Sequence, residues 1–238
     1  MTLKKYIPDA ITSLNLLCGT VGVVFAFKGR FDLAFYLMLM GAVFDFCDGL
    51  AARALGAYSD FGKELDSLSD MVTFGLLPSV LMYKMMTVST FSDCIWCYIP
   101  LVIAVMSGLR LAKFNVDERQ HDSFIGLATP ACAMICGSLC YFIAHDSGTF
   151  LAAWAAGYVF LPLVSVALSA LLVCEIPMFS FKNSDKSPLT RRKRLFFLVD
   201  IVIIVAIVAT LGLNWSLVML MSMIVYILLN VVFAIFKI

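Results

Sequence analysis

Apolar runs of about twenty residues, the length that an α-helix needs to cross a bilayer, alternate with short polar stretches along this chain. Eight such runs are present, over residues 11–27, 33–54, 67–85, 96–113, 126–145, 150–174, 195–213 and 215–236. The pattern predicts an all-α fold, a polytopic membrane protein whose bundle contains about eight transmembrane helices.

The longest polar stretch, residues 179–194, divides the runs into a group of six and a terminal pair. Residues 1–178 are therefore expected to form a six-helix core with an interfacial amphipathic segment at Leu3–Pro8. Residues 195–238 would form a separate helix pair. The stretch between them contains the basic run SDKSPLTRRKR, whose charge suits either contact with anionic lipid headgroups or control of topology.

Basic residues are unevenly divided between the two sides that alternating helices define. Fourteen of the seventeen fall on one side, and only Lys28, Arg30 and Lys84 fall on the other. Because loops rich in Lys and Arg stay in the cytoplasm, both termini are predicted to be cytoplasmic and the protein to lie in the inner membrane. A composition of 62% hydrophobic and 14% charged residues excludes an ordinary soluble domain, and no nucleic-acid partner is expected.

The eight cysteines do not have the pattern of a disulfide framework. Cys132, Cys136 and Cys140 recur every four residues, which places them on one face of a helix. Cys94 and Cys97 form a lone CxxC without a second ligand pair nearby, so a packing role is favoured over a zinc site.

Four of the five aspartates between residues 45 and 70 form two closely spaced pairs that interrupt the apolar pattern. Asp45 and Asp48 are three residues apart at the inner end of the second predicted helix, and Asp66 and Asp70 are four apart at the start of the third. Both spacings place two carboxylates on one helical face. Charged groups are costly in membrane helices, so a hairpin that brings the two pairs together needs compensating cations.

Hard divalent cations compensate clustered carboxylates, because carboxylate oxygens are their preferred ligands in proteins. Mg²⁺ and Mn²⁺ are the expected ions, and Ca²⁺ can substitute for them structurally. Such ions also bind phosphate oxygens and neutralise the charge that develops during phosphoryl transfer. The aspartates therefore predict a metal site that binds a diphosphate.

Small residues beside the aspartates leave room for a ligand. Gly49 and Ala52 follow the aspartates of the second helix, and Gly62 lies one turn before those of the third. Close helix packing is the alternative explanation for each glycine taken alone. Arg53 supplies a cation that suits a phosphate oxygen at the rim of the site.

Residues 45–70 match the signature DxxDGxxAR, eight residues, GxxxDxxxD at all eight fixed positions. This is the signature of the CDP-alcohol phosphotransferases, and the chain resembles that family over about residues 6–174. The resemblance implies a two-metal active site that opens toward the cytoplasm. It also implies CDP-diacylglycerol as the donor, a setting among membrane lipids, and a homodimer.

The resemblance assigns roles to single residues. Asp45, Asp48 and Asp66 resemble metal ligands, and Asp70 resembles the family's last aspartate, a ligand of the second metal and the proposed catalytic general base. The residues expected to bind the nucleotide and the CDP-lipid are Asn15, Asp48, Gly49, Ala52, Arg53, Gly62 and Asp66. For Asn15, a hydrogen bond between helices is the competing explanation.

Two later segments bear on the acceptor alcohol. RLAKFN at residues 110–115 and GLATPA at residues 126–131 resemble the RLARFN and GLPSPAA segments of bacterial phosphatidylserine synthases, with mild departures. The resemblance implies L-serine as the acceptor. Arg110, Lys113 and Asn115 are the expected acceptor- or phosphate-binding residues, and the two cations could hold a serine carboxylate, the CDP diphosphate or an acceptor phosphate. A phosphatidylglycerophosphate synthase, or another member with a different acceptor, is the alternative. Topology alone also explains the two cations, and the Thr-Pro pair marks the start or a kink of a helix.

Two other classes of membrane protein also place carboxylates among helices. A transporter would hold them near the bilayer midplane and show repeated halves, and a cation channel would need a ring of charges. Here the aspartates cluster at one face without an internal repeat. An enzyme is therefore favoured, in which the serine hydroxyl attacks the phosphorus that carries the diacylglycerol and CMP leaves.

Overall fold

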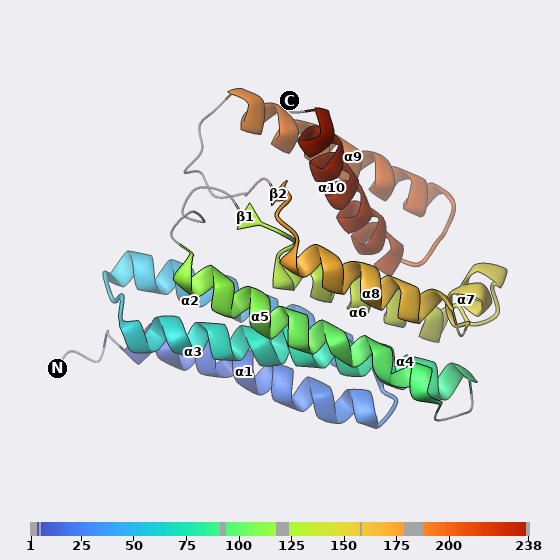
Figure 1. Ribbon diagram of the computed structural model, residues 1–238, viewed down its shortest axis with the longest axis horizontal. Coiled ribbons are helices and arrows are strands. Elements are labelled where there is room, and N and C mark those ends of the chain that lie inside the picture. Colours follow the sequence, from blue (N-terminus) through green and yellow to red (C-terminus); the bar gives the residue numbers. More distant parts are fainter. Residues whose placement is uncertain are drawn as a thin grey trace.

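The structure is a computed structural model that describes residue 4 and residues 6–90, 94–117, 124–157, 159–178 and 188–236. Helices account for nearly all of these residues (Figure 1). They are α1 (Tyr6–Phe27), α2 (Phe31–Leu55), α3 (Asp60–Asp70), a π-helical segment (Met71–Leu76), α4 (Leu77–Thr90), a 3₁₀ segment (Ile95–Leu101), α5 (Val102–Val116), α6 (Thr129–His145), α7 (Phe150–Ala155), α8 (Phe160–Val173), α9 (Pro188–Thr210) and α10 (Ser216–Phe236).

Five helical segments of the described chain are long and apolar enough to cross a bilayer: residues 6–27, 31–55, 60–89, 95–116 and 216–235. Three shorter apolar helices accompany them, at residues 129–145, 160–173 and 195–210. The predicted all-α polytopic membrane fold is therefore confirmed.

One predicted span is wrong as a continuous helix. Residues 150–174 form the short α7 and then α8, which starts at Phe160. The break follows from the local sequence, because Thr149 caps α7, Gly157 lies in the turn, and Pro162 is tolerated only in the first turn of a helix. At 14 residues, α8 is about 21 Å long, which is shorter than the hydrocarbon core of a bilayer.

Other boundaries also differ from the expected ones. α1 begins at Tyr6, so part of the predicted interfacial segment Leu3–Pro8 belongs to that helix, whereas residues 3 and 5 lie outside the described residues. α9 begins at Pro188, inside the stretch expected to be a loop, whose residues 179–187 are also not described. The end of α9 precedes Gly212, which has the left-handed φ of 62° that often ends a helix.

The third predicted span begins at Asp60 rather than near residue 67. α3, the π-helical segment and α4 continue as one long helix, so Asp66 and Asp70 lie inside it. The π-helical segment follows directly after Asp70, and such wider turns are frequent at functional sites. It brings Thr73 against α1, where the Thr73 hydroxyl donates to the Asn15 carbonyl at 3.0 Å.

Small residues set the spacing of α1, α2 and this long helix. A Cβ at Gly19 would lie 2.8 Å from the Cα of Thr73, and a Cβ at Gly41 would lie 2.9 Å from the side-chain oxygen of Asn15. No side chain fits at these contacts, so glycine allows the three helices to approach closely. The buried apolar core continues from them along α4 and α6.

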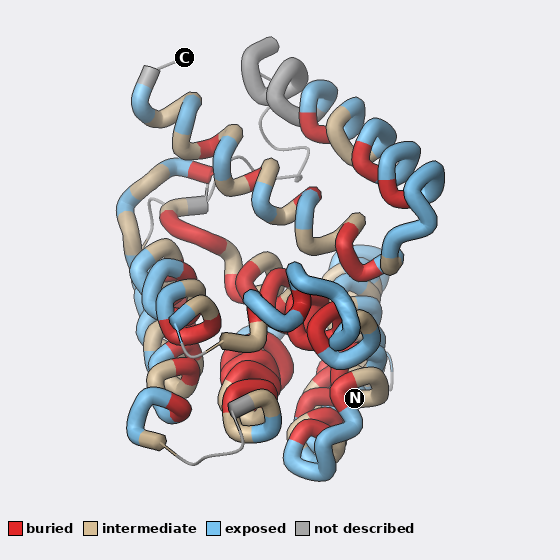
Figure 2. The backbone as a smooth tube through the Cα atoms, turned by 90° about the vertical axis from the view of Figure 1, so that its right-hand side faces the viewer, coloured by how far each residue is buried: buried red, intermediate tan, exposed pale blue. Residues whose placement is uncertain are grey.

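The C-terminal pair, α9 and α10, lies along one side of the other helices (Figures 1 and 2). α10 packs against α6. At the turn between the two helices, Trp215 stacks on Phe35 with ring centroids 5.7 Å apart, and Asn214 donates to Asp146 at 2.7 Å. These contacts fix the pair to the core.

Two short strands join the segment before α6 to the segment after α8. β1 (Phe124–Ile125) pairs antiparallel with β2 (Pro177–Met178). Gly126 follows with a left-handed φ of 78°, and a Cβ there would lie 2.8 Å from the carbonyl oxygens of Leu172 and Cys174. Glycine is required by both features, and it fixes the position at which α6 begins.

Candidate metal and nucleotide site

The connection between α2 and α3 is short and is capped at both ends. Gly56 has a φ of 59° at the end of α2, and the Ala57 N–H donates to the Ala52 carbonyl at 3.0 Å, as in a Schellman motif. Ser59 then caps α3 by accepting from the Gly62 N–H at 2.9 Å. This tight turn holds the two aspartate-bearing helices beside each other.

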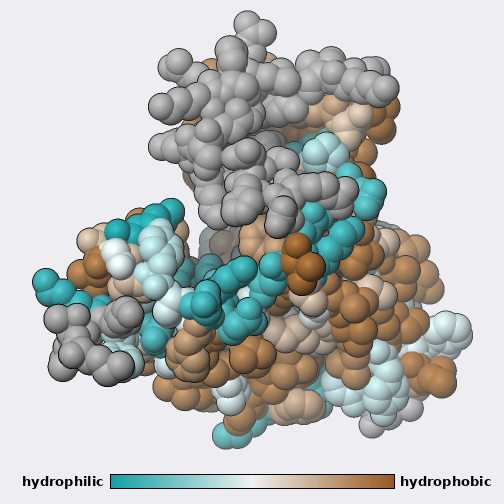
Figure 3. All heavy atoms as spheres, turned by 60° about the vertical axis from the view of Figure 1, so that its left-hand side comes forward, coloured by the Kyte–Doolittle hydropathy of each residue, from teal (hydrophilic) through white to brown (hydrophobic). Residues whose placement is uncertain are grey.

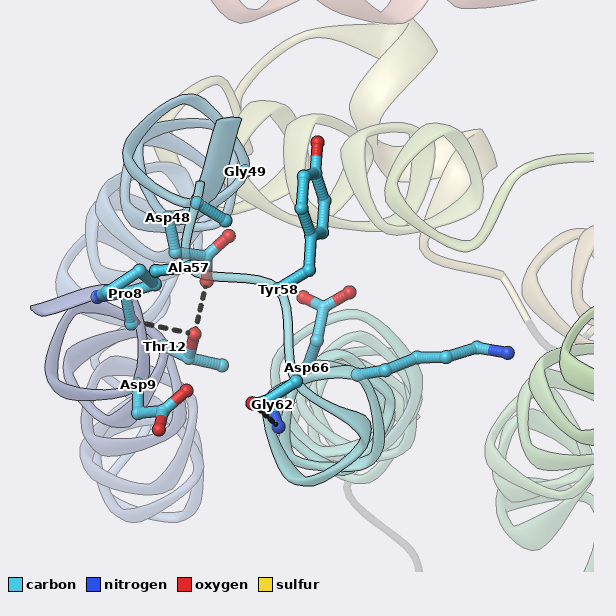
Figure 4. Close-up of a pocket in the computed structure, with 12 residues that line it drawn as sticks. Pro8, Asp9, Thr12, Asp48, Gly49, Ala57, Tyr58, Gly62 and Asp66 are labelled. Carbon is cyan, nitrogen blue, oxygen red and sulfur yellow. Dashed lines mark hydrogen bonds between the residues drawn. The ribbon is translucent and has the colours of Figure 1, made fainter. Parts of the chain in front are cut away.

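Three aspartates meet across this hairpin. One carboxylate oxygen from each of Asp45, Asp48 and Asp66 lies within 4.8 Å of the other two. Figure 4 shows Asp48 on α2 and Asp66 on α3 with their carboxylates in the space between the helices. Asp70 lies one turn after Asp66, within electrostatic reach of the other three. The hairpin therefore gathers all four carboxylates at one place.

The donor set fits a divalent cation. Oxygens this close to one another suit a hard ion, which takes about six oxygen ligands and keeps positions for water or phosphate. The cluster of described residues contains only carboxylates, which match Mg²⁺ or Mn²⁺ better than zinc. Without a cation the negative charges would repel one another in a membrane-embedded helix pair, which is costly.

The Asp70 side chain is hydrogen-bonded to α1. The amide of Asn15 donates to Asp70 at 3.3 Å, and Asn15 is fully buried. On either side of Asp70, the hydroxyls of Ser69 and Thr73 donate to α1 carbonyls. Asn15 was expected near the nucleotide, but it is not among the described residues that line the cavity and the cleft at the aspartates, both of which are described in the next two paragraphs. It makes the hydrogen bond between helices that was the competing explanation.

A cavity of about 210 Å³ lies between the first turns of α1, the end of α2 and the start of α3 (Figure 4). It is lined by Pro8, Asp9, Thr12, Asp48, Gly49, Ala52, Ala57, Tyr58, Ser59, Gly62, Lys63 and Asp66. The set includes all three small residues expected to leave room for a nucleotide. A Cβ at Gly49 would come no closer than 4.0 Å to the Arg53 guanidinium, so this part of the wall is open.

A larger cleft of about 580 Å³ adjoins this cavity. It is lined by Asp45, Phe46, Asp48, Gly49, Arg53, Tyr58, Lys63, Asp66, Ser67, Asp70, Arg110, Leu111, Phe114, Asn115, Ala128, Thr129 and Pro130. Asp48 and Asp66 line both spaces, which therefore meet at the carboxylates. Arg53 is exposed, and its Nε donates to the Gly49 carbonyl at 3.0 Å. Figure 3 shows hydrophilic residues in a band beside hydrophobic flanks, on the side where α2 ends.

The wall opposite the aspartates comes from α5 and the start of α6. Arg110 is buried, and its Nη1 donates to the Thr129 hydroxyl at 3.3 Å. The Asn115 amide donates to the Ser67 hydroxyl at 2.9 Å, which connects this wall to α3. Two of the three predicted acceptor residues thus line the same cleft as the aspartates.

Lys113 lies elsewhere. Its side chain is exposed and pairs with Glu175 at 3.4 Å, and it is not among the described residues that line the cleft. Exposed ion pairs of this kind contribute little to stability. The structure therefore separates Lys113 from Arg110 and Asn115, with which it was predicted to act.

Thr12 was not identified from the sequence, although it contacts the cluster directly. Its hydroxyl is buried and lies 2.6 Å from an Asp48 carboxylate oxygen and 3.0 Å from the Pro8 carbonyl (Figure 4). The sequence does contain a pattern that could have indicated Thr12. Thr12, Asn15 and Gly19 form a stripe of small and polar residues on one face of an otherwise apolar helix.

Thr12→Val is expected to raise the dissociation constant for Mn²⁺ by about tenfold, because hydrogen-bond partners of metal ligands typically contribute ten- to a hundredfold to metal affinity. Valine keeps the shape and removes the hydroxyl that donates to Asp48. Calorimetric titration of the detergent-solubilised protein measures the change. Thr20→Val is the matched control, since the exposed Thr20 hydroxyl donates only to the Leu16 carbonyl of its own helix. Equal Mn²⁺ affinity in the two variants would contradict the role of Thr12.

Comparison with known proteins identifies a matching family and several similar proteins. A family model described as CDP-alcohol phosphatidyltransferase matches residues 5–171. The CDP-diacylglycerol–serine O-phosphatidyltransferase of Bacillus subtilis is 38% identical over 130 residues, which cover 55% of this chain and 72% of that protein. The protein of the same name from Mycobacterium leprae is 33% identical over 182 residues, which cover 73% of this chain and 58% of that protein.

An archaeal relative is also similar. The archaetidylserine synthase of Methanothermobacter thermautotrophicus is 32% identical over 134 residues, 56% of this chain and 56% of that protein. The chain thus spans less than two thirds of the mycobacterial and archaeal relatives. The family model, in contrast, matches well over half of the chain and includes all four aspartates. The chain therefore belongs to the CDP-alcohol phosphatidyltransferase family.

Proposed function

We propose that the protein transfers the phosphatidyl group of CDP-diacylglycerol to the hydroxyl of L-serine and releases CMP. One observation carries the proposal: the four aspartates face Arg110 and Asn115 across a single cleft. A donor diphosphate and a small alcohol must meet in one space for direct transfer between them. The relatives named as serine O-phosphatidyltransferases support serine as the alcohol.

The smaller cavity is the proposed site for the cytidine nucleotide. Gly49, Ala52 and Gly62 leave its walls free of large side chains, and Asp48 and Asp66 connect it to the cleft. Arg53, at the rim, is placed to attract a phosphate oxygen of the CDP-lipid. Asn15 supports this arrangement indirectly, through its hydrogen bond to Asp70.

Asp45, Asp48, Asp66 and Asp70 would hold two divalent cations, Mg²⁺ or Mn²⁺, with Ca²⁺ as a structural substitute. When bound, such cations neutralise charge on the diphosphate and on the leaving group. Asp70 would accept the proton of the serine hydroxyl, because its carboxylate lines the cleft. The serine oxygen then bonds to the phosphorus that carries the diacylglycerol, the bond from that phosphorus to the CMP oxygen breaks, and CMP leaves.

The acceptor would bind to the opposite wall. The Arg110 guanidinium can hold the serine carboxylate, and the Asn115 amide can bind a polar group of serine. Lys113, at the exposed edge and paired with Glu175, would attract anionic substrates from outside the cleft. This division assigns specificity to α5 and the start of α6, and phosphatidyl activation to α2 and α3.

The site is proposed to open toward the cytoplasm from the inner membrane, with the diacylglycerol chains in the lipid. Residues 1–178 would form the catalytic core, residues 179–194 a basic segment beside anionic headgroups, and residues 195–238 an additional helix pair. A homodimer is proposed because the family resemblance implies one. The fourteen basic residues that the sequence places on the same side as both termini support this orientation.

Measurement of CMP release from CDP-diacylglycerol, with Mg²⁺ or Mn²⁺ present, tests the proposal. L-Serine is expected to increase the rate at least about a hundredfold over the rate without acceptor, since an oriented acceptor replaces water. Glycerol 3-phosphate and inositol phosphate are expected to give the rate without acceptor. Release that depends on either of these alcohols instead would overturn serine as the acceptor, and no release with any alcohol would overturn the transferase itself.

A further inference from the structure

Two cysteines lie where the long third helix is joined to the 3₁₀ segment. That helix ends at Thr90, and the 3₁₀ segment begins at Ile95, at the end away from α3 and the aspartates (Figure 1). From Asp70 to Thr90 the helix rises about 30 Å, which is the thickness of the hydrocarbon core of a bilayer. Cys94 and Cys97 are therefore far from the metal site, and the proposed transfer does not use them.

The backbone between the two cysteines is a tight turn. Cys94 precedes the 3₁₀ segment, and the Cys97 N–H donates to the Cys94 carbonyl at 3.0 Å. Pro100 favours this tighter winding, because in an α-helix its ring would clash with the Trp96 carbonyl. Side chains three residues apart eclipse each other in a 3₁₀ turn. Both thiols consequently point the same way, and their Sγ atoms lie 3.5 Å apart in a hydrogen bond.

This turn is suited to a disulfide, whereas the cysteine stripe on α6 is not. A turn closed in this way keeps its end Cα atoms within about 7 Å, and disulfides need Cα atoms that are about 4.4 to 6.8 Å apart. Cys132, Cys136 and Cys140 follow one another at four-residue spacing in an α-helix. Such neighbours have Cβ atoms about 5 to 6 Å apart, and a disulfide needs about 3.5 to 4.5 Å. Cys94 and Cys97 can therefore be joined with little movement.

The two thiols differ in exposure in a way that suits thiol–disulfide exchange. Cys94 is half-buried, and Cys97 is fully buried. The first thiol in an exchange must reach an external disulfide, whereas the second needs only to reach the first. A zinc site would need four ligands, but the aspartate cluster is the only group of three or more such ligands among the described residues. The geometry thus favours redox chemistry over metal binding.

We propose that Cys94 and Cys97 form a redox-active dithiol, which a disulfide-bearing oxidant converts into an intramolecular disulfide. The Cys94 thiolate attacks one sulfur of the oxidant, a mixed disulfide forms, and the other sulfur leaves as a thiolate. The Cys97 thiolate then attacks the Cys94 sulfur, and the second oxidant sulfur leaves. The two protein thiols lose two electrons and two protons, and the oxidant gains them as two thiols.

The disulfide would covalently close the turn at which the 3₁₀ segment begins. In the proposed orientation this end of the helices lies outside the cytoplasm, where disulfides form and persist. The inference goes beyond the proposed function and takes from it only the orientation in the membrane. Oxidation of the dithiol is therefore independent of the acceptor alcohol and of the metal.

Equilibration of the purified protein with glutathione, in detergent, tests the proposal. With about tenfold more reduced than oxidised glutathione, most molecules should form the Cys94–Cys97 disulfide, because its closing step is intramolecular. Alkylation with N-ethylmaleimide and mass spectrometry of the peptides identify the remaining thiols. Cys174 is the internal control, since it is also half-buried and donates to the Leu171 carbonyl at 3.1 Å, and it should remain alkylated. Equal alkylation of all three cysteines would overturn the proposal.

Two single variants test the order of attack. In Cys97→Ser, the Cys94 sulfur should retain glutathione as a mixed disulfide, because the second thiol is absent. In Cys94→Ser, the fraction of protein that carries glutathione should be at least about tenfold lower, because exposure controls the reactivity of the remaining, buried thiol. Cys97→Ala repeats the first measurement without a hydroxyl at the buried position. Equal glutathione on the two serine variants would overturn the proposed exchange.

A charged maleimide that does not cross membranes tests the side on which oxidation occurs. In intact cells treated with a reductant, it should label Cys94, whereas Cys174 should be labelled only after lysis. Labelling of Cys94 only after lysis would overturn its oxidation from outside. Disulfide formation in a protein that releases no CMP with any alcohol would contradict only the proposed function.

Discussion

Asp70→Asn is expected to lower kcat for serine-dependent CMP release by about a thousandfold, within the range for loss of a general base. The substitution removes the charge that would accept the serine proton and retains an oxygen that can accept from Asn15. The protein should therefore fold and still bind the CDP-lipid. Steady-state CMP release at saturating substrates gives kcat, and thermal unfolding in detergent checks the fold.

Asp60→Asn provides the comparison for this experiment. Asp60 is an exposed carboxylate in the first turn of the same helix, and it lines neither cavity. Its replacement should leave kcat within about twofold, as for a surface substitution. If Asp70→Asn retained more than about a tenth of wild-type turnover, Asp70 would not be the base, because even a modest general base contributes about a hundredfold.

Removal of divalent metal is expected to have an equally large effect. A chelator should reduce CMP release to the rate without enzyme, and added Mg²⁺ or Mn²⁺ should restore it, because a bound cation would offset the charge of the clustered carboxylates and of the diphosphate. Bound metal should also raise the unfolding temperature. At a metal concentration of about a hundred times the dissociation constant, mass action stabilises the folded state by about 2.7 kcal/mol.

The unfolding temperature allows the metal site to be tested without turnover. In Asp66→Asn the metal-dependent rise should largely disappear, because Asp66 provides one of the three clustered oxygens. Asp32→Asn should retain it, since Asp32 lies at the other end of α2 and pairs with Arg30 at 3.2 Å on the surface. A rise that persists in Asp66→Asn and vanishes in Asp32→Asn would place the metal elsewhere.

The grouping of the aspartates could be predicted because its geometry is local. Spacings of three and four residues define one helical face, and a short hairpin is enough to bring two such faces together. The start of α3 was predicted less well, because its first two turns, DFGKELD, are too polar to register as a membrane span. The caps at Gly56 and Ser59 were the better signal for this boundary.

Contacts between distant segments were harder to predict. Three residues along a helix leave an offset of about 60° around its axis, so Arg110 can face inward while Lys113 reaches the surface. Asn15 similarly points toward Asp70 rather than into a cavity, because α1 packs against the long third helix at its glycines. The stacking of Trp215 on Phe35 depends on how the C-terminal helix pair packs against the core, which no local pattern encodes.

The connection of only a few residues between α2 and α3 also bears on the order in which the protein is assembled during synthesis. All four carboxylates belong to one hairpin, so the donor half of the site needs only the first 70 residues of the chain and its α1 support. At ribosomal speeds of about 5 to 20 residues per second, Thr129 at the start of α6 emerges roughly 3 to 12 s later. The nascent protein therefore passes through a stage with its charged cluster complete and its acceptor wall missing, during which early metal capture would protect the membrane-embedded carboxylates.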